Sequence, residues 1–156
     1  MPDLHWLQDH PQHCTTMATW LYEQFHYEYA EQSLAEWQAE FAAGQSNGAW
    51  PSLVAVENGQ LLGGAALAEE DLPGREDLGP WLACVFVTPA ARGKGVAEVL
   101  IEGVCERARQ QGVKRLYLHT QDRADYYAKR GWVAVETFVR WDKAQTLMAK
   151  DLQARS

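Results

Sequence analysis

The chain reads VTPAARGKGVA from Val87 to Ala97, and the interpretation of the whole sequence starts from this stretch. An uninterrupted apolar run from Trp81 to Val87 leads into it, and beyond it apolar residues recur at intervals of three and four as far as Gly112. The first pattern is typical of a strand buried on both faces, and the second of an amphipathic helix. The stretch is therefore predicted to be a glycine-rich turn between a central strand and a helix.

A turn of this composition favours an anion site. The first amides of a helix lack partners within the helix, the helix dipole attracts negative charge, and glycine lets a phosphate approach the backbone. Arg92 and Lys94 add two cations. No Ser or Thr follows Lys94, as a nucleotide-triphosphate loop requires, and Glu98 occupies the third small position of a dinucleotide fingerprint. An ordinary tight connection without a ligand also accounts for the glycines.

Before the central strand, the sequence predicts two helices and a hairpin. The first helix has Asp9 as its cap and extends to Phe25, while the second begins with the capping box Ser33 to Glu36 and stops at Gly44. Asn and Gly at positions 58–59, between two apolar runs, are typical of a two-residue hairpin turn because both positions tolerate positive φ.

After the amphipathic helix, the pattern returns to strands. The expected elements are a strand at Leu116–His119, a short helix from Asp122 to Arg130, and strands at Trp132–Trp141 and Gln145–Leu152. This order of elements predicts one α/β (α+β) domain over residues 1–156.

Composition and charge exclude several classes of protein. A chain of 156 residues with 47% hydrophobic and 22% charged residues is an ordinary globular domain. A formal charge of −7 disfavours a nucleic-acid binder, which needs clustered cations. The longest apolar run, Leu61–Ala68, is far shorter than the roughly 20 residues that cross a bilayer, so no membrane span is expected. The first residues lack the pattern of a secretory signal, which favours a cytoplasmic location.

Cysteine and histidine spacing gives no indication of a metal site. Cys14, Cys84 and Cys105 are odd in number and none forms a C-x-x-C pair, which disfavours both a disulfide framework and a zinc knuckle. The histidines do not cluster with carboxylates or cysteines at the spacing of metal ligands. We therefore expect no metal.

Two motifs resemble the GNAT superfamily of acyl-CoA-dependent N-acetyltransferases. The family signature Gln/Arg-x-x-Gly-x-Gly/Ala is met by the segment from Arg92 to Ala97. Downstream, Tyr126 and Tyr127 precede Gly131 and a tryptophan with the spacing found in many family members. The resemblance covers nearly the whole chain and implies a central mixed, mostly antiparallel sheet of six to seven strands flanked by about four helices.

The resemblance also implies a binding site for acetyl-CoA as co-substrate. The pantetheine arm would run beside Val85, Phe86 and Val87, and Tyr127 would bind near the thioester and act as the acid for the departing thiolate. The pyrophosphate would lie on the turn, against Arg92, Gly93, Lys94, Gly95, Val96 and Ala97.

The proton acceptor for the incoming amine is less well defined. An alkylamine has a pKa of about 10.4 and must lose a proton before it attacks, so a carboxylate or ordered water is needed nearby. Four carboxylates flank the loop before the central strand, and Glu70 and Asp71 are the preferred candidates over Glu69 and Asp77. A solvated acidic loop explains all four equally well.

The expected function is therefore transfer of an acetyl group from acetyl-CoA to a primary amine of a small molecule or peptide. The amine would attack directly in a ternary complex, because Cys84 is not beside an identifiable histidine. The resemblance is to bacterial members whose acceptor is unassigned. The expected partners are acetyl-CoA and an amine acceptor, without nucleic acid or membrane, and the protein is expected to be a monomer or homodimer. The alternatives are a non-catalytic acyl-CoA-binding module and a protein N-terminal or lysine acetyltransferase.

Overall fold

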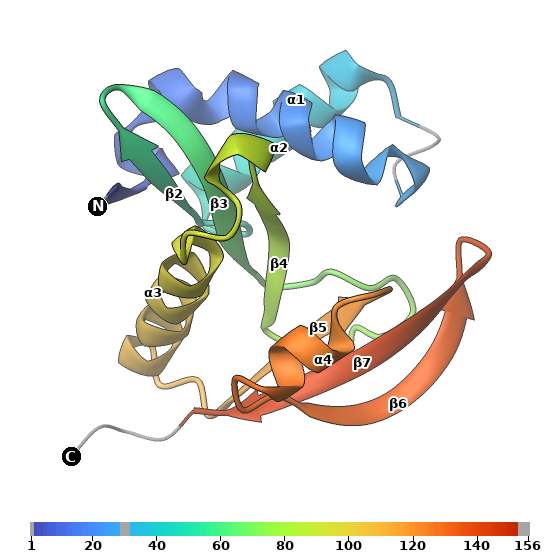
Figure 1. Ribbon diagram of the computed structural model, residues 1–156. Helices are drawn as coiled ribbons and strands as arrows, with labels where there is room; N and C mark the ends of the chain where they lie inside the picture. The colour runs from blue at the N-terminus through green and yellow to red at the C-terminus, as the bar shows by residue number, and fades with distance from the viewer. Residues whose placement is uncertain (1, 29–31, 153–156) are drawn as a thin grey trace.

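The computed structural model describes residues 2–28 and 32–152, and this part of the chain contains both strands and helices (Figure 1). The strands are β1 (Asp3–Trp6), β2 (Ser52–Glu57), β3 (Gln60–Ala68), β4 (Trp81–Val87), β5 (Arg115–Thr120), β6 (Val133–Arg140) and β7 (Lys143–Asp151). The helices are α1 (Cys14–Phe25), α2 (Leu34–Asn47), α3 (Val96–Gln110) and α4 (Ala124–Ala128). The predicted hairpin, central strand, following helix and last three strands are confirmed to within two residues.

The seven strands form one sheet in the order β1-β2-β3-β4-β5-β7-β6. Every neighbouring pair is antiparallel except β4 and β5, which are parallel. This arrangement confirms the mixed, mostly antiparallel sheet, with β4 at its centre.

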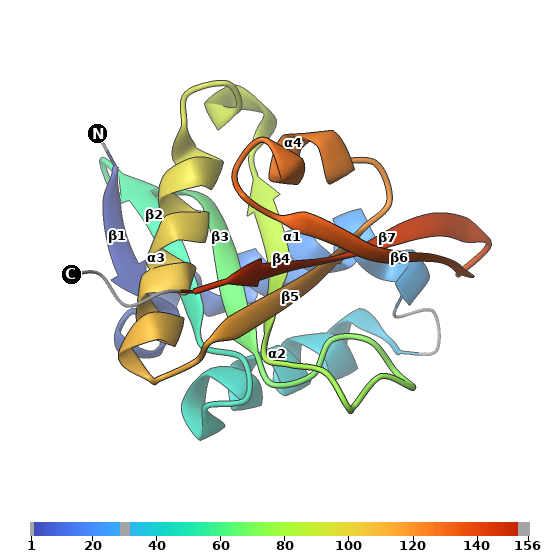
Figure 2. The same ribbon diagram turned by 90° about the horizontal axis from the view of Figure 1, so that it is seen from below.

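The parallel pair holds together at one point only. Trp81 lies opposite Tyr117, and the Tyr117 amide donates a hydrogen bond to the carbonyl of Pro80 at 3.1 Å. Beyond this point the two strands diverge, as Figures 1 and 2 show from two directions. The edge of β4 from Leu82 to Val87 therefore faces open space on the β5 side, rather than another described strand. This explains why residues 84–86 are half-buried, whereas the sequence predicted a strand covered on both faces.

A β-bulge alters β4 beside this opening. Ala83 pairs with Ala66 and Phe86 with the glycine two residues earlier in β3, so Cys84 and Val85 together lie opposite Ala65. Cys84 has a φ of 55°, a left-handed conformation that is uncommon for a residue with a side chain. The bulge turns backbone groups of β4 away from the regular ladder where the strand borders the opening.

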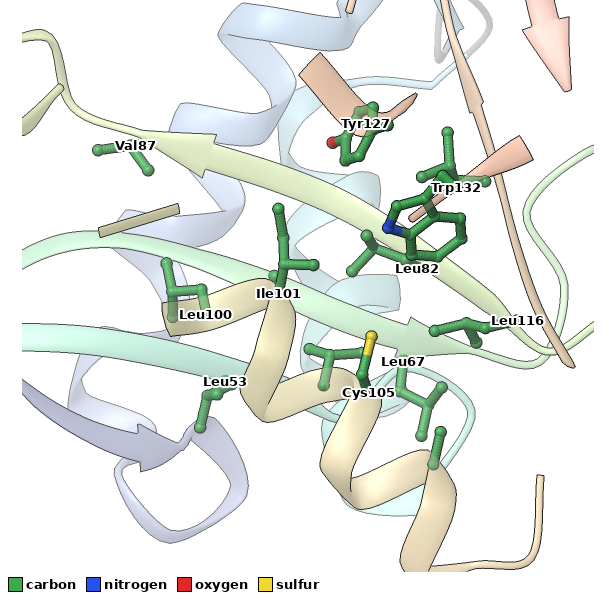
Figure 3. Packing of buried hydrophobic residues seen from close by; sticks show 14 of the residues in the cluster. Leu53, Leu67, Leu82, Val87, Leu100, Ile101, Cys105, Leu116, Tyr127 and Trp132 are labelled. Atoms are coloured by element: carbon green, nitrogen blue, oxygen red, sulfur yellow. The ribbon is translucent and has the colours of Figure 1, made fainter. Parts of the chain in front are cut away.

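Helices cover both faces of the sheet. Helices α1 and α2 lie on one face, and α3 and α4 lie on the other (Figures 1 and 2). Side chains of β2 alternate between the two faces of the sheet, so that Leu53 packs with α3 and Val54 packs with α1 and α2. Figure 3 shows Ile101 and Cys105 of α3 directed onto the sheet, close to Leu82.

The second helix ends later than its sequence predicts. The capping box at Ser33 and Glu36 is present, with Oγ of Ser33 accepting from the Glu36 amide at 3.1 Å. However, α2 passes through Gly44 and ends at Gly48, which has the left-handed φ of 82° that closes a helix. A Cβ at Gly44 would lie 2.7 Å from Cε3 of Trp50. Glycine is therefore needed there for close packing rather than for termination.

Two predicted helix caps are also wrong. Asp9 belongs to a 3-10 turn, Leu7–Asp9, and a second turn, Pro11–His13, separates it from α1. The residue at the start of α4 is Arg123 rather than Asp122, and its amide donates to Oγ1 of Thr120 at 3.1 Å. In both places a tighter turn replaces the first turn of the expected helix.

The acidic loop between β3 and β4 is tied to the last hairpin. Arg75 forms an ion pair with Glu136 of β6, and its Nε lies 3.2 Å from Oδ1 of Asp77. From the other side, Nη1 of Arg140 donates to the carbonyl of Pro73 at 2.7 Å. These contacts hold the loop beside the C-terminal half of the sheet.

Replacement of Gly63 by alanine tests the packing that positions β4. A Cβ at Gly63 would lie 2.3 Å from the carbonyl oxygen of Phe86, which is backbone and has little room to move. We expect Gly63→Ala to lower the free energy of unfolding by about 2–3 kcal/mol, measured by urea denaturation. Gly59→Ala is the control, because nothing lies within 4 Å and only its φ of 76° opposes a side chain, at about 1 kcal/mol. Equal losses in the two variants would contradict this packing argument.

Candidate active site

A cavity of about 730 Å³ occupies the space where β4 and β5 diverge. It is lined by the C-terminal part of β4, the first turn of α3, the end of β5 with the turn after it, and α4. Residues from the end of α1 and the 3-10 turn His26–Glu28 close the side opposite α3. The cavity thus lies at the only parallel junction of the described sheet, in the range of volumes typical of small-molecule sites.

The glycine-rich turn forms one end of the cavity. Gly93 and Gly95 have φ values of 78° and 79°, which side-chain-bearing residues rarely adopt, so the turn requires glycine at both positions. Gly95 is the N-cap of α3 and has no side chain to satisfy the first amides of the helix. Arg92 fastens the turn to the strand, because its Nε donates to the carbonyl of Val87 at 3.0 Å. The turn has the geometry of an anion site at a helix N-terminus.

The structure brings most of the predicted co-substrate residues together. Of the predicted co-substrate residues, those that line the cavity are Val85, Phe86, Val87, Arg92, Gly93, Gly95, Val96, Ala97 and Tyr127. Lys94 is exposed and does not line it. Lys94 is therefore placed to contribute charge at a distance rather than contact within the cavity.

Tyr127 reaches the cavity from α4. Its ring packs edge-on against Tyr126 and Trp132, with centroids 5.2 Å and 6.0 Å away. Figure 3 shows the hydroxyl pointing away from Trp132, toward the end of β4 that carries Val87. Burial raises the pKa of Tyr127 to about 12, so the hydroxyl remains a proton donor across the physiological range.

A stacked arginine closes the wall beside α4. The guanidinium of Arg130 lies 3.7 Å above the ring of Tyr126 and donates to Oε1 of Glu98 in the first turn of α3, with Nε 2.9 Å away. This bond links α4 to α3 across the cavity mouth. The positive charge of Arg130 also offsets the negative charge of Glu98, which lies next to the amides of the glycine-rich turn.

The opposite end of the cavity contains an acid cluster, defined here as Glu28, Asp71 and His119. Nε2 of His119 lies 3.0 Å from Oδ2 of Asp71, and the two side chains are only 6% and 21% exposed. Nδ1 of His119 lies 3.4 Å from Oε1 of Gln145, which belongs to β7, the strand that pairs with β5. The cluster combines two carboxylates and one imidazole from three distant segments.

Ionisation in the acid cluster differs from that of free side chains. Burial raises the pKa of Glu28 to about 7, the negative charge of Asp71 adds to this effect, and His119 and Tyr27 oppose it. Burial alone would lower the pKa of His119, but its contact with Asp71 and the charges of Asp71 and Glu28 outweigh burial and raise it. A carboxyl group with a pKa near neutrality is suited to accept and release protons during turnover.

Sequence analysis identified only one member of this cluster. Asp71 lines the cavity, whereas Glu70, the alternative proton acceptor, is exposed and does not line it. Glu28 and His119 carry no local motif and are brought to Asp71 by the topology alone. Their one sequence signal is position, since His119 stands near the end of the strand that diverges from β4.

No group of three or more His, Cys, Asp and Glu side chains in residues 2–28 and 32–152 is arranged to hold a metal ion. None of the helices in that part of the chain is long and apolar enough to cross a membrane.

A sheet that splays at its central parallel pair, with a glycine-rich turn at the opening, agrees with the resemblance of the sequence to acyl-CoA-dependent N-acetyltransferases. The family model described as Acetyltransferase (GNAT) family matches residues 14–132, and the chain belongs to this family. Comparison with curated protein sequences gives no match.

Solved structures of low sequence identity share the fold. An aminoglycoside 6'-N-acetyltransferase in complex with coenzyme A is 16% identical, with 99% of each chain covered and a TM-score of 0.77. The protein yncA from Salmonella typhimurium with its cofactor acetyl-CoA is 18% identical, with 100% of this chain and 96% of that chain covered and a TM-score of 0.74. An N-acetyltransferase from Staphylococcus aureus Mu50 is 20% identical, with 98% and 99% covered and a TM-score of 0.75.

The ionisation of Glu28 makes stability depend on pH. A carboxyl group whose pKa rises from 4.5 to about 7 on folding binds more protons in the folded state, so the free energy of unfolding falls as pH rises through this interval. We expect Glu28→Gln to be more stable than wild type at pH 8, by about 1–2 kcal/mol after allowance for partial exposure, and equally stable at pH 4, below the unfolded-state pKa.

Urea denaturation at the two pH values measures this difference. Glu76→Gln is the matched control, because Glu76 is an exposed carboxylate outside the cavity whose Oε1 accepts from the Gly74 amide, as an amide oxygen also does. A Glu28→Gln variant with no gain at pH 8 would show that the carboxylate of Glu28 is not desolvated in the folded protein.

Proposed function

We propose that the protein transfers the acetyl group of acetyl-CoA to a primary amine of a small molecule or peptide, by direct attack in a ternary complex. The observation that carries the proposal is the charge division of the cavity. Backbone amides and Arg92 stand at one end, the acid cluster stands at the other, and the unpaired edge of β4 lies between them. Two of the structurally similar proteins hold coenzyme A or acetyl-CoA, which supports the same co-substrate here.

The donor end is suited to the phosphates and the pantetheine arm. The first amides of α3 and the guanidinium of Arg92 would hold the pyrophosphate, as a helix N-terminus and a cation do for other anions. The open edge of β4 from Val85 to Val87 offers backbone groups that would pair with the amide groups of the arm, other than the carbonyl of Val87, which accepts from Arg92. The bulge at Cys84 breaks the regular ladder beside this edge, and backbone donors there would stabilise the negative charge that develops on the thioester carbonyl.

Tyr127 would stabilise the leaving group. When the amine nitrogen forms its bond to the carbonyl carbon and the C–S bond breaks, negative charge develops on sulfur. A phenol with a pKa of about 12 gives up its proton less readily than an ordinary thiol of pKa about 8.5, so Tyr127 acts mainly as a hydrogen-bond donor to the thiolate. Most of the acceleration would come from holding both substrates in place.

Substitution of Gly95 tests the phosphate site. Glutamate at this position would place a side chain and a negative charge over the first amides of α3, and we expect Gly95→Glu to weaken acetyl-CoA binding at least 30-fold in calorimetric titration. Gly95→Ala carries the same backbone strain at a φ of 79° without the charge, and should weaken binding only a few-fold. Unchanged affinity in Gly95→Glu would refute the assignment of the turn.

Removal of one hydroxyl tests the role of Tyr127. We expect Tyr127→Phe to lower kcat by 10- to 100-fold while the Kd for acetyl-CoA stays within twofold, because the hydroxyl contributes when charge appears on sulfur. Tyr126→Phe removes the adjacent phenol, whose ring lies under Arg130, and should retain wild-type turnover. Release of free CoA during turnover on an amine panel supplies kcat, and wild-type kcat in Tyr127→Phe would remove Tyr127 from the mechanism.

A further inference from the structure

The acid cluster offers more than a single proton acceptor. Its three members come from separate walls of the cavity. Glu28 ends the 3-10 turn after α1, Asp71 stands in the loop after β3, and His119 lies near the end of β5. Nothing in the core requires an ion pair at this place. Two carboxylates and an imidazole partly removed from water, facing open cavity, are more costly than apolar residues unless a ligand uses them.

The charges around the cluster leave its cavity face negative. Glu28 and Asp71 carry two negative charges when ionised, and a protonated His119 cancels only one of them. Asp122 also lies close enough for its charge to act on Tyr27, but Nε of Arg123 is 4.0 Å from its Oδ1, and Nζ of Lys143 lies 5.0 Å above the ring of Tyr27, so these outer groups add no net negative charge.

Two of the three arginines that line the cavity, Arg92 and Arg130, stand at its other end, whereas the third, Arg123, is paired with Asp122. Arg92 belongs to the glycine-rich turn, Arg123 precedes α4, and Arg130 follows it and is paired with Glu98. Among the residues that line the cavity, charge is therefore separated into a donor end that attracts phosphates and an acceptor end that attracts a cation.

Aromatic faces accompany the negative charge. Phe25 and Tyr27 lie on the α1 side of the acceptor end, and Phe86 lies on β4 between the two ends. Aromatic rings attract an ammonium group through their negative faces and exclude water from its alkyl part. A substrate with a carboxylate beside its amine would instead place like charges against Glu28 and Asp71, which selects against it.

We propose that Glu28, Asp71 and His119 form the acceptor site for a cationic primary amine that has no carboxylate next to the reacting nitrogen, and that Glu28 takes the proton from its ammonium group. This inference rests on the proposed acetyltransferase activity. Asp71 and His119 are positioning residues. Asp71 orients the imidazole of His119, and the imidazole fixes the positions of the Glu28 and Asp71 carboxylates.

The proton balance follows from these roles. The ammonium group gives one proton to the Glu28 carboxylate, and the free amine then forms the N–C bond to the acetyl carbon. As the C–S bond breaks, the electron pair goes to sulfur, and the nitrogen loses its second proton. One of the two protons ends on the thiol of CoA, and the other leaves to solvent from Glu28. The net reaction converts an ammonium ion and a thioester into an amide, a thiol and one proton.

Binding without turnover tests the acceptor site. Protein saturated with CoA is titrated calorimetrically with agmatine, tyramine, phenethylamine and tryptamine, and with the matching amino acids arginine, tyrosine, phenylalanine and tryptophan, whose one primary amine stands next to a carboxylate. We expect at least one amine to bind tenfold or more tightly than its amino acid, and Glu28→Gln and Asp71→Asn each to weaken that binding tenfold or more. Glu76→Gln removes an exposed carboxylate from the same loop as Asp71 and should bind within twofold of wild type.

The outcomes separate this inference from the proposed function. If CoA fails to bind, the acetyltransferase assignment itself falls, and the acceptor site with it. If CoA binds but none of the four amines does, or if amines and amino acids bind equally, or if both variants bind like wild type, the acceptor site alone is overturned.

Two further readouts isolate the roles within the cluster. The kcat/KM for the tightest-binding amine should rise with pH around 7 in wild type, since Glu28 must be ionised, and Glu28→Gln should lose that rise. The imidazole of His119, followed by NMR, should titrate at lower pH in Asp71→Asn than in wild type, because a partner that raises its pKa is gone. An unchanged pH profile in Glu28→Gln would assign proton removal to another group, and an unchanged His119 titration would remove Asp71 from its positioning role.

Discussion

The structure depends on one incomplete strand pairing. β4 and β5 meet at Trp81 and Tyr117 and then separate, so the middle of a seven-stranded sheet contains an opening instead of a continuous ladder. A backbone edge buried without partners is unfavourable, and the chain resolves this by lining the opening with solvent-accessible space and a bulge at Cys84. The cavity, the anion turn and the approach of Tyr127 are all consequences of that separation.

The positive and the negative end of the cavity are built from different parts of the chain. The donor end is built from consecutive residues, because a strand, a turn with two left-handed glycines and a helix N-terminus follow one another between Val87 and Val96. The acceptor end is assembled from segments more than forty residues apart in sequence, Glu28, Asp71 and His119. In the proposed reaction, the two substrates would be held at opposite ends of one cavity, and Tyr127 and Glu28 would stabilise or accept the charge that develops between them.

This difference in assembly explains what the sequence predicts and what it does not. The glycine-rich turn, the capping box of α2 and the Asn-Gly hairpin are local patterns that predict a local conformation, and the structure contains each of them. The end of α2 was misplaced because Gly44 makes room for Trp50, which is a tertiary contact with no local signature. Likewise, Glu28 and His119 are ordinary residues in sequence, and only the sheet order brings them to Asp71.

The ties between the acidic loop and the last hairpin have a consequence for how such a protein diverges. Arg75 and Arg140 attach the loop that bears Asp71 to β6, an edge strand far from the glycine-rich turn. Substitutions at these outer positions would shift the acceptor end and leave the donor end intact, because Arg75 and Arg140 contact the loop and not the glycine-rich turn. Lineages descended from such an ancestor would therefore keep their acyl donor while exchanging acceptors, and a laboratory library aimed at new acceptors would best be confined to the loop and the hairpin.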